Sequence, residues 1–275
     1  MPSFKITIAY DGSPFVGWQR QAAGTSVQGL IEDVLRDLDE QNVAVAGAGR
    51  TDAGVHALGQ VASFTLRRVI TADVLARALN ACLPDEVRVV SAEEVAPSFH
   101  ARFGARAKTY RYRIWNADLL DPFERAYAWY VPGPLAIDAM QTAARVLEGR
   151  HDFAALQAAA SARGSTERVV FFSRVVAPCD SGGADLGLPA RSRRPERVEG
   201  RRGLLTYEIS GNGFLRHMVR RIAGSLVDIG RGRRSPEWLS AVVASRDRNQ
   251  AGPTAPAHGL FLVGVDYGEK DGEEK

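Results

Sequence analysis

The sequence predicts an α+β protein with two ferredoxin-like halves, each with an antiparallel sheet, and a cleft between them. The first observation is the order strand–helix–strand–strand–helix–strand, which occurs twice along the chain. The second is the amphipathic spacing of the helical segments, which gives each helix one apolar face to cover a sheet. The third is size, because 275 residues that are 45% hydrophobic can bury one large core or two moderate ones.

The first predicted half covers residues 1–105. Apolar residues that alternate with polar ones, or form short runs, predict strands at 3–10, 43–46, 61–65 and 87–95. Apolar residues at helical spacing predict helices at 27–38 and 74–82. Thr25 and Gln28 can form a capping box for the first helix, and Thr71 can cap the second.

The second predicted half, residues 106–268, repeats this order of elements without visible sequence self-similarity. Strands are predicted at 109–115, 168–176, 204–209 and 260–267, and helices at 137–147, 214–229 and 236–245. An inserted segment at about 178–203 is rich in Gly, Pro, Ser and Arg and poor in apolar residues, which predicts a mobile hairpin loop. Residues 269–275 form an acidic tail.

The net charge of +3 says little, but the basic residues are clustered. Five fall between Arg102 and Arg113, six between Arg191 and Arg202, and six between Arg216 and Arg234. Clustered arginine favours a polyanionic partner, because arginine binds phosphate oxygens and each contact releases counterions. A merely solvated basic surface is an equally good interpretation from charge alone.

Composition also narrows the class of protein. No apolar run approaches the roughly 18 residues that span a bilayer, and the N-terminus lacks a signal-peptide layout, so we expect a soluble, cytoplasmic protein without a membrane partner. Cys82 and Cys179 lie far apart without metal-ligand spacing. Neither a metal site nor a disulfide framework is therefore expected.

The glycine-rich stretch at 47–56 follows a predicted strand and carries Arg50 and Asp52. Such glycines let the backbone approach a ligand, which makes Asp52 a candidate catalytic residue. A lone loop aspartate is more often an Asx-turn residue. Dinucleotide binding is a weak rival, because its third glycine would stand at position 52 and no helix pattern follows.

This stretch and four other segments resemble the TruA family of pseudouridine synthases. The matching segments are GRTDAGVHA at 49–57; AYDG at 9–12 with GWQR at 17–20; FHARF at 99–103 with KTYRY at 108–112; NGF at 212–214 with HMVR at 217–220 and GSL at 224–226; and GLFL at 259–262 with VDY at 265–267. They follow the family's order from position 9 to 267. The long 178–203 loop and the acidic tail depart from the pattern, and STER at 165–168 fits it only loosely.

The resemblance implies a tRNA pseudouridine synthase that isomerises uridine at positions 38, 39 and 40 of the tRNA anticodon stem-loop. It implies no cofactor and a homodimer, and it places the active site in the cleft between the halves. Asp52 would be the nucleophile, attacking C1′ or C6 or starting a glycal route. The runner-up is a non-catalytic RNA-binding protein on the same scaffold, which would use the same basic clusters.

The resemblance also implies roles for four residues around the substrate. Arg220 would provide the cation beside Asp52, and Tyr110 would stack on the flipped-out uracil and take its C5 proton. Leu260 would exclude water near the base, and Arg50 would fill the space that the base leaves. Without the resemblance, the arginines could equally be phosphate contacts, and the other two could be core residues.

Overall fold

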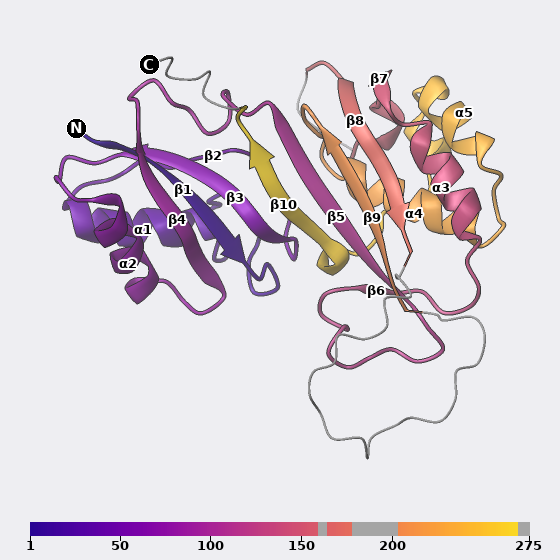
Figure 1. The fold of residues 1–275 in the computed structure, drawn as a ribbon, viewed down its shortest axis with the longest axis horizontal. Coiled ribbons are helices and arrows are strands. Elements are labelled where there is room, and N and C mark those ends of the chain that lie inside the picture. The colour runs from indigo at the N-terminus through magenta and orange to yellow at the C-terminus, as the bar shows by residue number, and fades with distance from the viewer. Residues whose placement is uncertain (159–163, 178–202, 269–275) are drawn as a thin grey trace, which may run out of the picture.

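The computed structural model describes residues 1–158, 164–177 and 203–268, and the inserted loop and acidic tail lie outside these ranges. It is a mixed α/β fold around one ten-stranded, mostly antiparallel sheet (Figure 1). The strands are β1 (Ser3–Tyr10), β2 (Ala46–Gly47), β3 (His56–Thr65), β4 (Val87–Val95), β5 (Ala107–Asn116), β6 (Trp129–Tyr130), β7 (Gly149–Asp152), β8 (Glu167–Val176), β9 (Gly203–Gly211) and β10 (Leu260–Asp266).

Strand β10 joins the two parts of the sheet, whose order is β4-β1-β3-β10-β5-β9-β8-β7. It pairs in parallel with the start of β3, where Phe261 lies opposite His56, and antiparallel with β5, where Leu262 lies opposite Tyr110. The short strands β2 and β6 pair with β3 and β5. The two sheets expected from the sequence are therefore continuous, because the last strand hydrogen-bonds along both of its edges.

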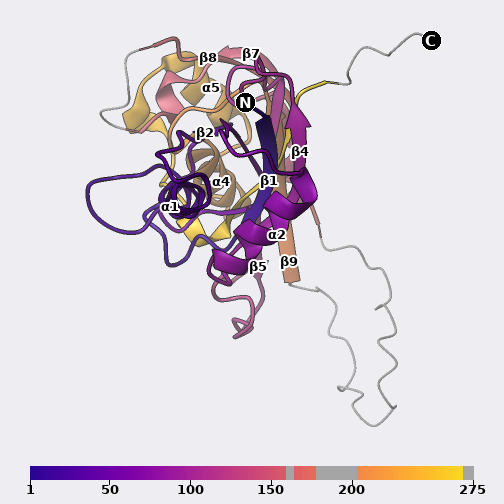
Figure 2. The same ribbon diagram turned by 90° about the vertical axis from the view of Figure 1, so that its left-hand side faces the viewer.

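Five α-helices of the described residues line the sheet, α1 and α2 against its N-terminal part and α3, α4 and α5 against its C-terminal part (Figure 1). Figure 2 shows α1 and α4 on the same side of the strands. The helices are α1 (Val27–Asp39), α2 (Ala72–Cys82), α3 (Ile137–Arg145), α4 (Met218–Gly230) and α5 (Glu237–Ser245).

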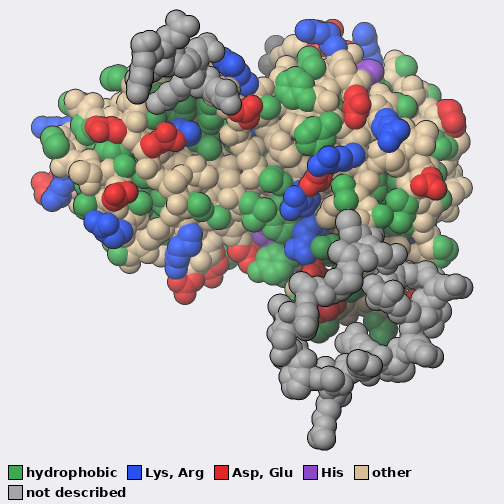
Figure 3. Space-filling model, viewed as in Figure 1, with side chains coloured by type: hydrophobic (Ala, Val, Ile, Leu, Met, Phe, Trp, Pro, Cys, Tyr) green, Lys and Arg blue, Asp and Glu red, His purple; other side chains and the backbone are tan. Residues whose placement is uncertain are grey.

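Residue alternation along the strands defines two faces of the sheet. In β5, Tyr110 and Tyr112 are buried on the side that the helices cover, which we call the helix face. Arg111 points to the opposite, open face, where Glu208 of β9 pairs with it and with Arg174 of β8, at 2.8 and 2.7 Å. Figure 3 shows basic and acidic side chains side by side over this face.

Several boundaries differ from the sequence prediction. Ser26, and not Thr25, is the N-cap of α1, since its hydroxyl accepts from the Gly29 amide at 3.1 Å. Thr71 does precede α2, but its side chain makes no capping hydrogen bond. The 43–46 strand is reduced to β2, while β3 begins five residues earlier than predicted, at His56, because it pairs with β1 as far back as Ala57.

Two further differences concern the second part of the chain. The helix predicted from 214 begins only at Met218, because His217 has φ +64°, which interrupts a right-handed helix. The short strands β6 and β7 were not predicted. One hydrophobic cluster nevertheless runs from Phe4 to Leu262, so the core is shared by the whole sheet. None of the described helices is long and apolar enough to cross a membrane.

Candidate active site

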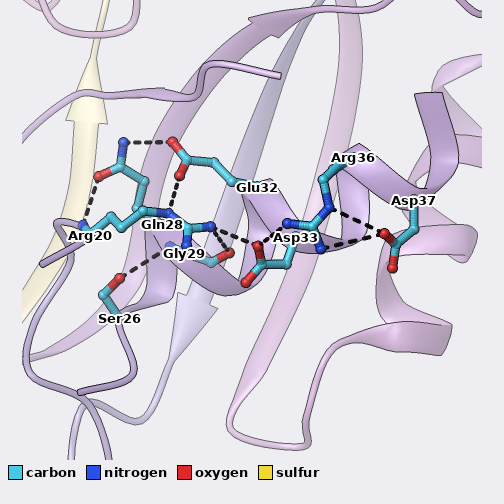
Figure 4. A network of polar contacts seen from close by, with 8 residues as sticks. All are labelled: Arg20, Ser26, Gln28, Gly29, Glu32, Asp33, Arg36 and Asp37. Carbon is cyan, nitrogen blue, oxygen red and sulfur yellow. Dashed lines mark hydrogen bonds and ion pairs between the residues drawn. The ribbon is translucent and has the colours of Figure 1, made fainter. Parts of the chain in front are cut away.

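The loop after β1 is held on helix α1 by Arg20. Its guanidinium bonds to Glu32 at 2.6 Å, to Asp33 at 2.9 Å and to the Gly29 carbonyl at 2.8 Å (Figure 4). The Gln28 side chain accepts from the Arg20 amide at 3.0 Å. This network fixes the end of the loop against α1, and it thereby fixes the course of the backbone just before Arg20.

That path places Gly17 and Trp18 against the glycine-rich stretch. Gly17 bridges to Asp52, and the Trp18 amide donates to the Thr51 carbonyl at 3.1 Å. Gly17 has φ +109°, and a Cβ there would lie 2.5 Å from the Thr51 oxygen. A side chain at Gly47 would likewise meet the indole of Trp18. Glycine is needed at both positions because the two loops approach within backbone contact.

Tyr10, at the end of β1, also contacts the glycine-rich stretch. Its hydroxyl lies 2.8 Å from Oγ1 of Thr51, and burial raises its pKa to about 12. The phenol is therefore neutral at physiological pH and acts as a fixed hydrogen-bonding group. The adjacent Asp52 points its carboxylate away from the core, with 28% of the side chain exposed.

Three basic side chains from the start of α4 surround the Asp52 carboxylate. Nε of Arg216 lies 3.6 Å, Nε2 of His217 3.5 Å and Nη1 of Arg220 3.7 Å from its oxygens. These distances are longer than hydrogen bonds, so the attraction is electrostatic. The carboxylate thus faces a concentrated positive charge in a partly desolvated position.

Arg220 is the most firmly held of the three. Its Nε donates to the Ala255 carbonyl at 2.7 Å, and the Ala255 amide donates back to the Arg220 carbonyl at 3.1 Å. Only 16% of the Arg220 side chain is exposed, against 62% for Arg216. The segment before β10 therefore holds the Arg220 guanidinium toward Asp52, whereas the Arg216 guanidinium stays largely in solvent.

Burial lowers the pKa of His217 below its ordinary value, against the attraction of Asp52, and Arg220 and Arg216 lower it further. A neutral imidazole follows at physiological pH, so the arginines carry the positive charge next to the aspartate. His217 reaches this position through its left-handed backbone.

Tyr110 lies on the helix face beside this cluster, between Leu262 of β10 and Ile209 of β9. Its ring is 7% exposed and meets Phe214 edge-on, with 5.1 Å between the ring centroids. Burial raises its pKa, and the neighbouring Tyr10 and Asp52 add to the effect. The structure thus brings Tyr110, Asp52 and Arg220 together.

Leu260 and Arg50 sit less centrally. Leu260 is buried at 6% exposure and lies opposite Tyr112, two residues further along β5 than Tyr110. The Tyr112 hydroxyl donates to the Pro256 carbonyl at 2.8 Å, which holds the entry to β10. Arg50 is exposed in the glycine-rich stretch and makes no ion pair with another residue of the described ranges.

His56 fixes the far end of the glycine-rich stretch. Its Nδ1 accepts from the Gly12 amide and its Nε2 meets the His258 carbonyl, both at 3.1 Å, and its ring stacks on Phe261. Burial lowers its pKa, so the neutral ring that this pattern requires is favoured. These contacts indicate that His56 holds the glycine-rich stretch in place and takes no part in catalysis.

Sequence reasoning missed two of the groups at Asp52. It assigned no role to His217 and counted Arg216 only as one member of the basic cluster that ends at Arg234. Arg221, in the same cluster, donates through its guanidinium to three backbone carbonyls at 3.2 Å, those of Ala155, Gln157 and Arg248. The available signal for Arg216 and His217 was their position four and three residues before Arg220, within the helix that the sequence predicts from 214.

No cluster of three or more potential metal ligands is found among the residues that the structure describes.

The comparisons with known proteins point to one family. Residues 6–104 and 143–268 match the family described as tRNA pseudouridine synthase. The chain is similar to the tRNA pseudouridine synthase A of Myxococcus xanthus, with 43% identity over 97% of this chain and 92% of that protein. It is similar to the enzymes of the same name from Moorella thermoacetica and Solibacter usitatus, at 42% and 41% identity, over 97% of this chain and the full length of each.

Proposed function

Because the chain belongs to the tRNA pseudouridine synthase family, and is accordingly an isomerase that modifies tRNA, we propose that it converts uridine to pseudouridine at positions 38, 39 and 40 of the anticodon stem-loop, with Asp52 as nucleophile. The observation that carries this proposal is the Asp52 carboxylate, set between Arg220 and Arg216 and beside the buried ring of Tyr110. A carboxylate in this setting suits covalent catalysis, which divides one difficult displacement into easier steps.

The reaction breaks the bond between N1 of uracil and C1′ of ribose, turns the base, and joins C5 to C1′. In the ribose route, a carboxylate oxygen of Asp52 bonds to C1′ while N1 leaves with the electron pair. C5 of the turned base then attacks C1′ and releases the carboxylate, C5 loses its proton, and N1 gains one. Attack at C6 and the glycal route remain alternatives. All three are redox-neutral and need no group donor, which agrees with the expectation of no cofactor.

The side chains around Asp52 suit distinct tasks. Arg220, held by Ala255, orients the carboxylate and offers charge to the departing uracil anion. Tyr110 stacks on the flipped base, a contact worth about 1–3 kcal/mol. Its raised pKa disfavours the phenolate, so we assign it stacking ahead of proton removal. Leu260 packs behind the base and keeps water out.

The target base must leave its stack before it reaches Asp52, which costs a few kcal/mol. Arg50 is exposed two residues before Asp52, where it can fill the space that the flipped base leaves in the RNA stack. The strand orders β4-β1-β3, with β2 beside β3, and β10-β5-β9-β8 are compatible with two ferredoxin-like halves that divide near residue 105. Cytoplasmic location and a homodimer stay predictions, and light scattering on the purified protein tests the second.

Tritium release from a tRNA transcript labelled at C5 of uracil tests the nucleophile. Wild type should release tritium, and Asp52→Asn should not, although it should still bind the transcript. Asp228→Asn is the matched control, because Asp228 pairs with Arg233 at the other end of α4. Substantial turnover by Asp52→Asn would remove the nucleophile assignment. Binding without release by wild type would favour the non-catalytic RNA-binding function, and mapping the product to other positions would overturn the proposed sites.

A further inference from the structure

Lys108 is a partly buried cation beside the active site that the mechanism does not use. It lies on β5 two residues before Tyr110 and on the same face, about 7 Å along the strand. Its ammonium packs against the glycine-rich stretch, since a Cβ built on Gly49 would lie 3.7 Å from Nζ. The side chain therefore points to the same side of the sheet as the site.

The charged groups that act on Lys108 are both positive. Burial lowers its pKa, and Arg102 and Arg168 lower it further. The Lys108 ammonium makes no hydrogen bond or ion pair with any other residue of the described ranges. Lysine side chains are rarely buried without a partner, because the lost hydration is not recovered.

The two cations that act on Lys108 differ in how they are held. Nη1 of Arg168 donates to the Ser165 and Glu167 carbonyls at 2.8 and 2.6 Å, which holds its guanidinium in place. Burial lowers the pKa of Arg168 as well. Arg102 is exposed and leaves its guanidinium free of carboxylates within the described part of the chain. Lys108 is thus a partly buried cation whose pKa two further cations, Arg168 and Arg102, lower.

The basic residues of the open face behave differently. Arg111 and Arg174 share Glu208, and Lys5 bonds to Glu93 at 2.7 Å. Arg111, Arg174 and Lys5 thus each face a carboxylate of the protein, whereas no carboxylate of the described residues pairs with Lys108, Arg102 or Arg168.

We propose that Lys108, with Arg102 and Arg168, binds a backbone phosphate of the RNA strand next to the flipped-out uridine. This inference rests on the proposed function, because it takes the nucleotide on Tyr110 as its reference point. Single-stranded nucleic acid is commonly held by a stacking aromatic side chain beside a cationic groove that follows the backbone. A phosphate would also supply the missing counter-charge, and lysine binds phosphate as a point charge.

The test replaces Lys108 by methionine, which keeps the length of the side chain and removes the charge. Lys5→Met is the matched control, because its ammonium lies on the opposite face and is already paired. Binding of tRNA is measured over a range of salt concentrations. We expect Lys108→Met to weaken binding by about tenfold, as for the loss of a charge-assisted hydrogen bond. The slope of log K against log salt should become shallower by about 0.7–0.9, and that of Lys5→Met should be unchanged.

A second measurement locates the phosphate. Single methylphosphonate linkages are placed at each position around the target uridine in a stem-loop RNA. Wild type should lose about tenfold in affinity at one flanking linkage, and Lys108→Met should lose nothing further there. Arg102→Gln provides a second variant at an exposed position, where folding is not at risk, and should also flatten the salt slope.

The melting temperature separates phosphate binding from a structural role in supporting Gly49. Removing an unpaired, partly buried charge should leave the melting temperature unchanged or raise it. A wild-type salt slope in both variants, or undiminished methylphosphonate sensitivity in Lys108→Met, would overturn the inference. Tritium release by wild type and Lys5→Met reports the proposed function separately, so the two can fail independently.

Discussion

Asp52 balances several positive charges, so its removal should destabilise the fold as well as stop catalysis. Its oxygens lie 3.7 Å from Nη1 of Arg220 and 3.6 Å from Nε of Arg216. Two unit charges at this separation attract by about 1 kcal/mol in water and by about 4.5 kcal/mol at an effective dielectric constant of about 20. The distances are nearly equal, and exposure therefore decides which pair is stronger.

The two arginines differ in exposure, at 16% for Arg220 and 62% for Arg216. The Asp52–Arg220 pair lies between the two dielectric limits, which predicts a coupling free energy of about 2 kcal/mol. The Asp52–Arg216 pair should contribute under about 1 kcal/mol, as exposed ion pairs do. Asp52→Asn alone should lower stability by about 2 kcal/mol, because the remaining cations then repel one another.

Double-mutant cycles on urea unfolding measure both couplings, with Asp52→Asn combined in turn with Arg220→Met and Arg216→Met. Tryptophan fluorescence reports the transition, since the chain has four tryptophans. Added salt should reduce the Arg216 coupling more than the Arg220 coupling, because the first pair is more open to screening. Equal couplings, or greater stability of Asp52→Asn than of wild type, would refute this account of the site.

Three further predictions concern the ring, the loop contact and the histidine. Tyr110→Ala should weaken stem-loop RNA binding by about 1–3 kcal/mol while Tyr110→Phe binds like wild type, and equal losses would contradict stacking. Gly17→Ala should abolish most tritium release and lower the melting temperature, because the added Cβ would lie 2.5 Å from a backbone oxygen. Gly133 also has positive φ but open space around it, so the control Gly133→Ala should lower the unfolding free energy by only about 1–2 kcal/mol. The lowered pKa of His217 means that the unfolded chain takes up its proton first, so stability should fall as pH drops below about 6.5 and level off below the folded pKa. His217→Asn should shrink the difference between the urea midpoints at pH 7.5 and 5.5, and an unchanged difference would remove His217 as a cause.

Much of the fold was predictable because its periodic patterns are strong. Strand β1 and helix α2 begin or end within two residues of their predicted limits, since alternating and helical apolar spacing directly reflect burial. The short strands β6 and β7 carry no such signal, because two or four residues cannot establish a period. The pairing of β10 with β3 could not be predicted from the sequence either, since it joins segments about two hundred residues apart by backbone hydrogen bonds.

The candidate site shows the same division between local pattern and long-range contact. The glycines around Asp52 indicated a close backbone approach, and the structure supplies the partner in Gly17. The sequence offered no way to see that Trp18 would occupy the space above Gly47. Lys108 was visible only as one basic residue among five, because its burial, and the lack of a carboxylate partner among the described residues, depend on strands and loops that meet after folding.

Three arginines near the start of α4 show why residue type alone could not assign their roles. Arg216 stays in solvent beside Asp52, Arg220 is held by Ala255 and faces Asp52, and Arg221 is bonded to backbone carbonyls. Arg220 and Arg221 differ by one residue, or about 100° around a helix, which suffices to turn one toward the site and the other toward the loop at 155–157. The rotation of the helix against the sheet decides which arginine meets the carboxylate. That rotation is set by the apolar face of α4, so the packing of the core and the charge around Asp52 are determined together.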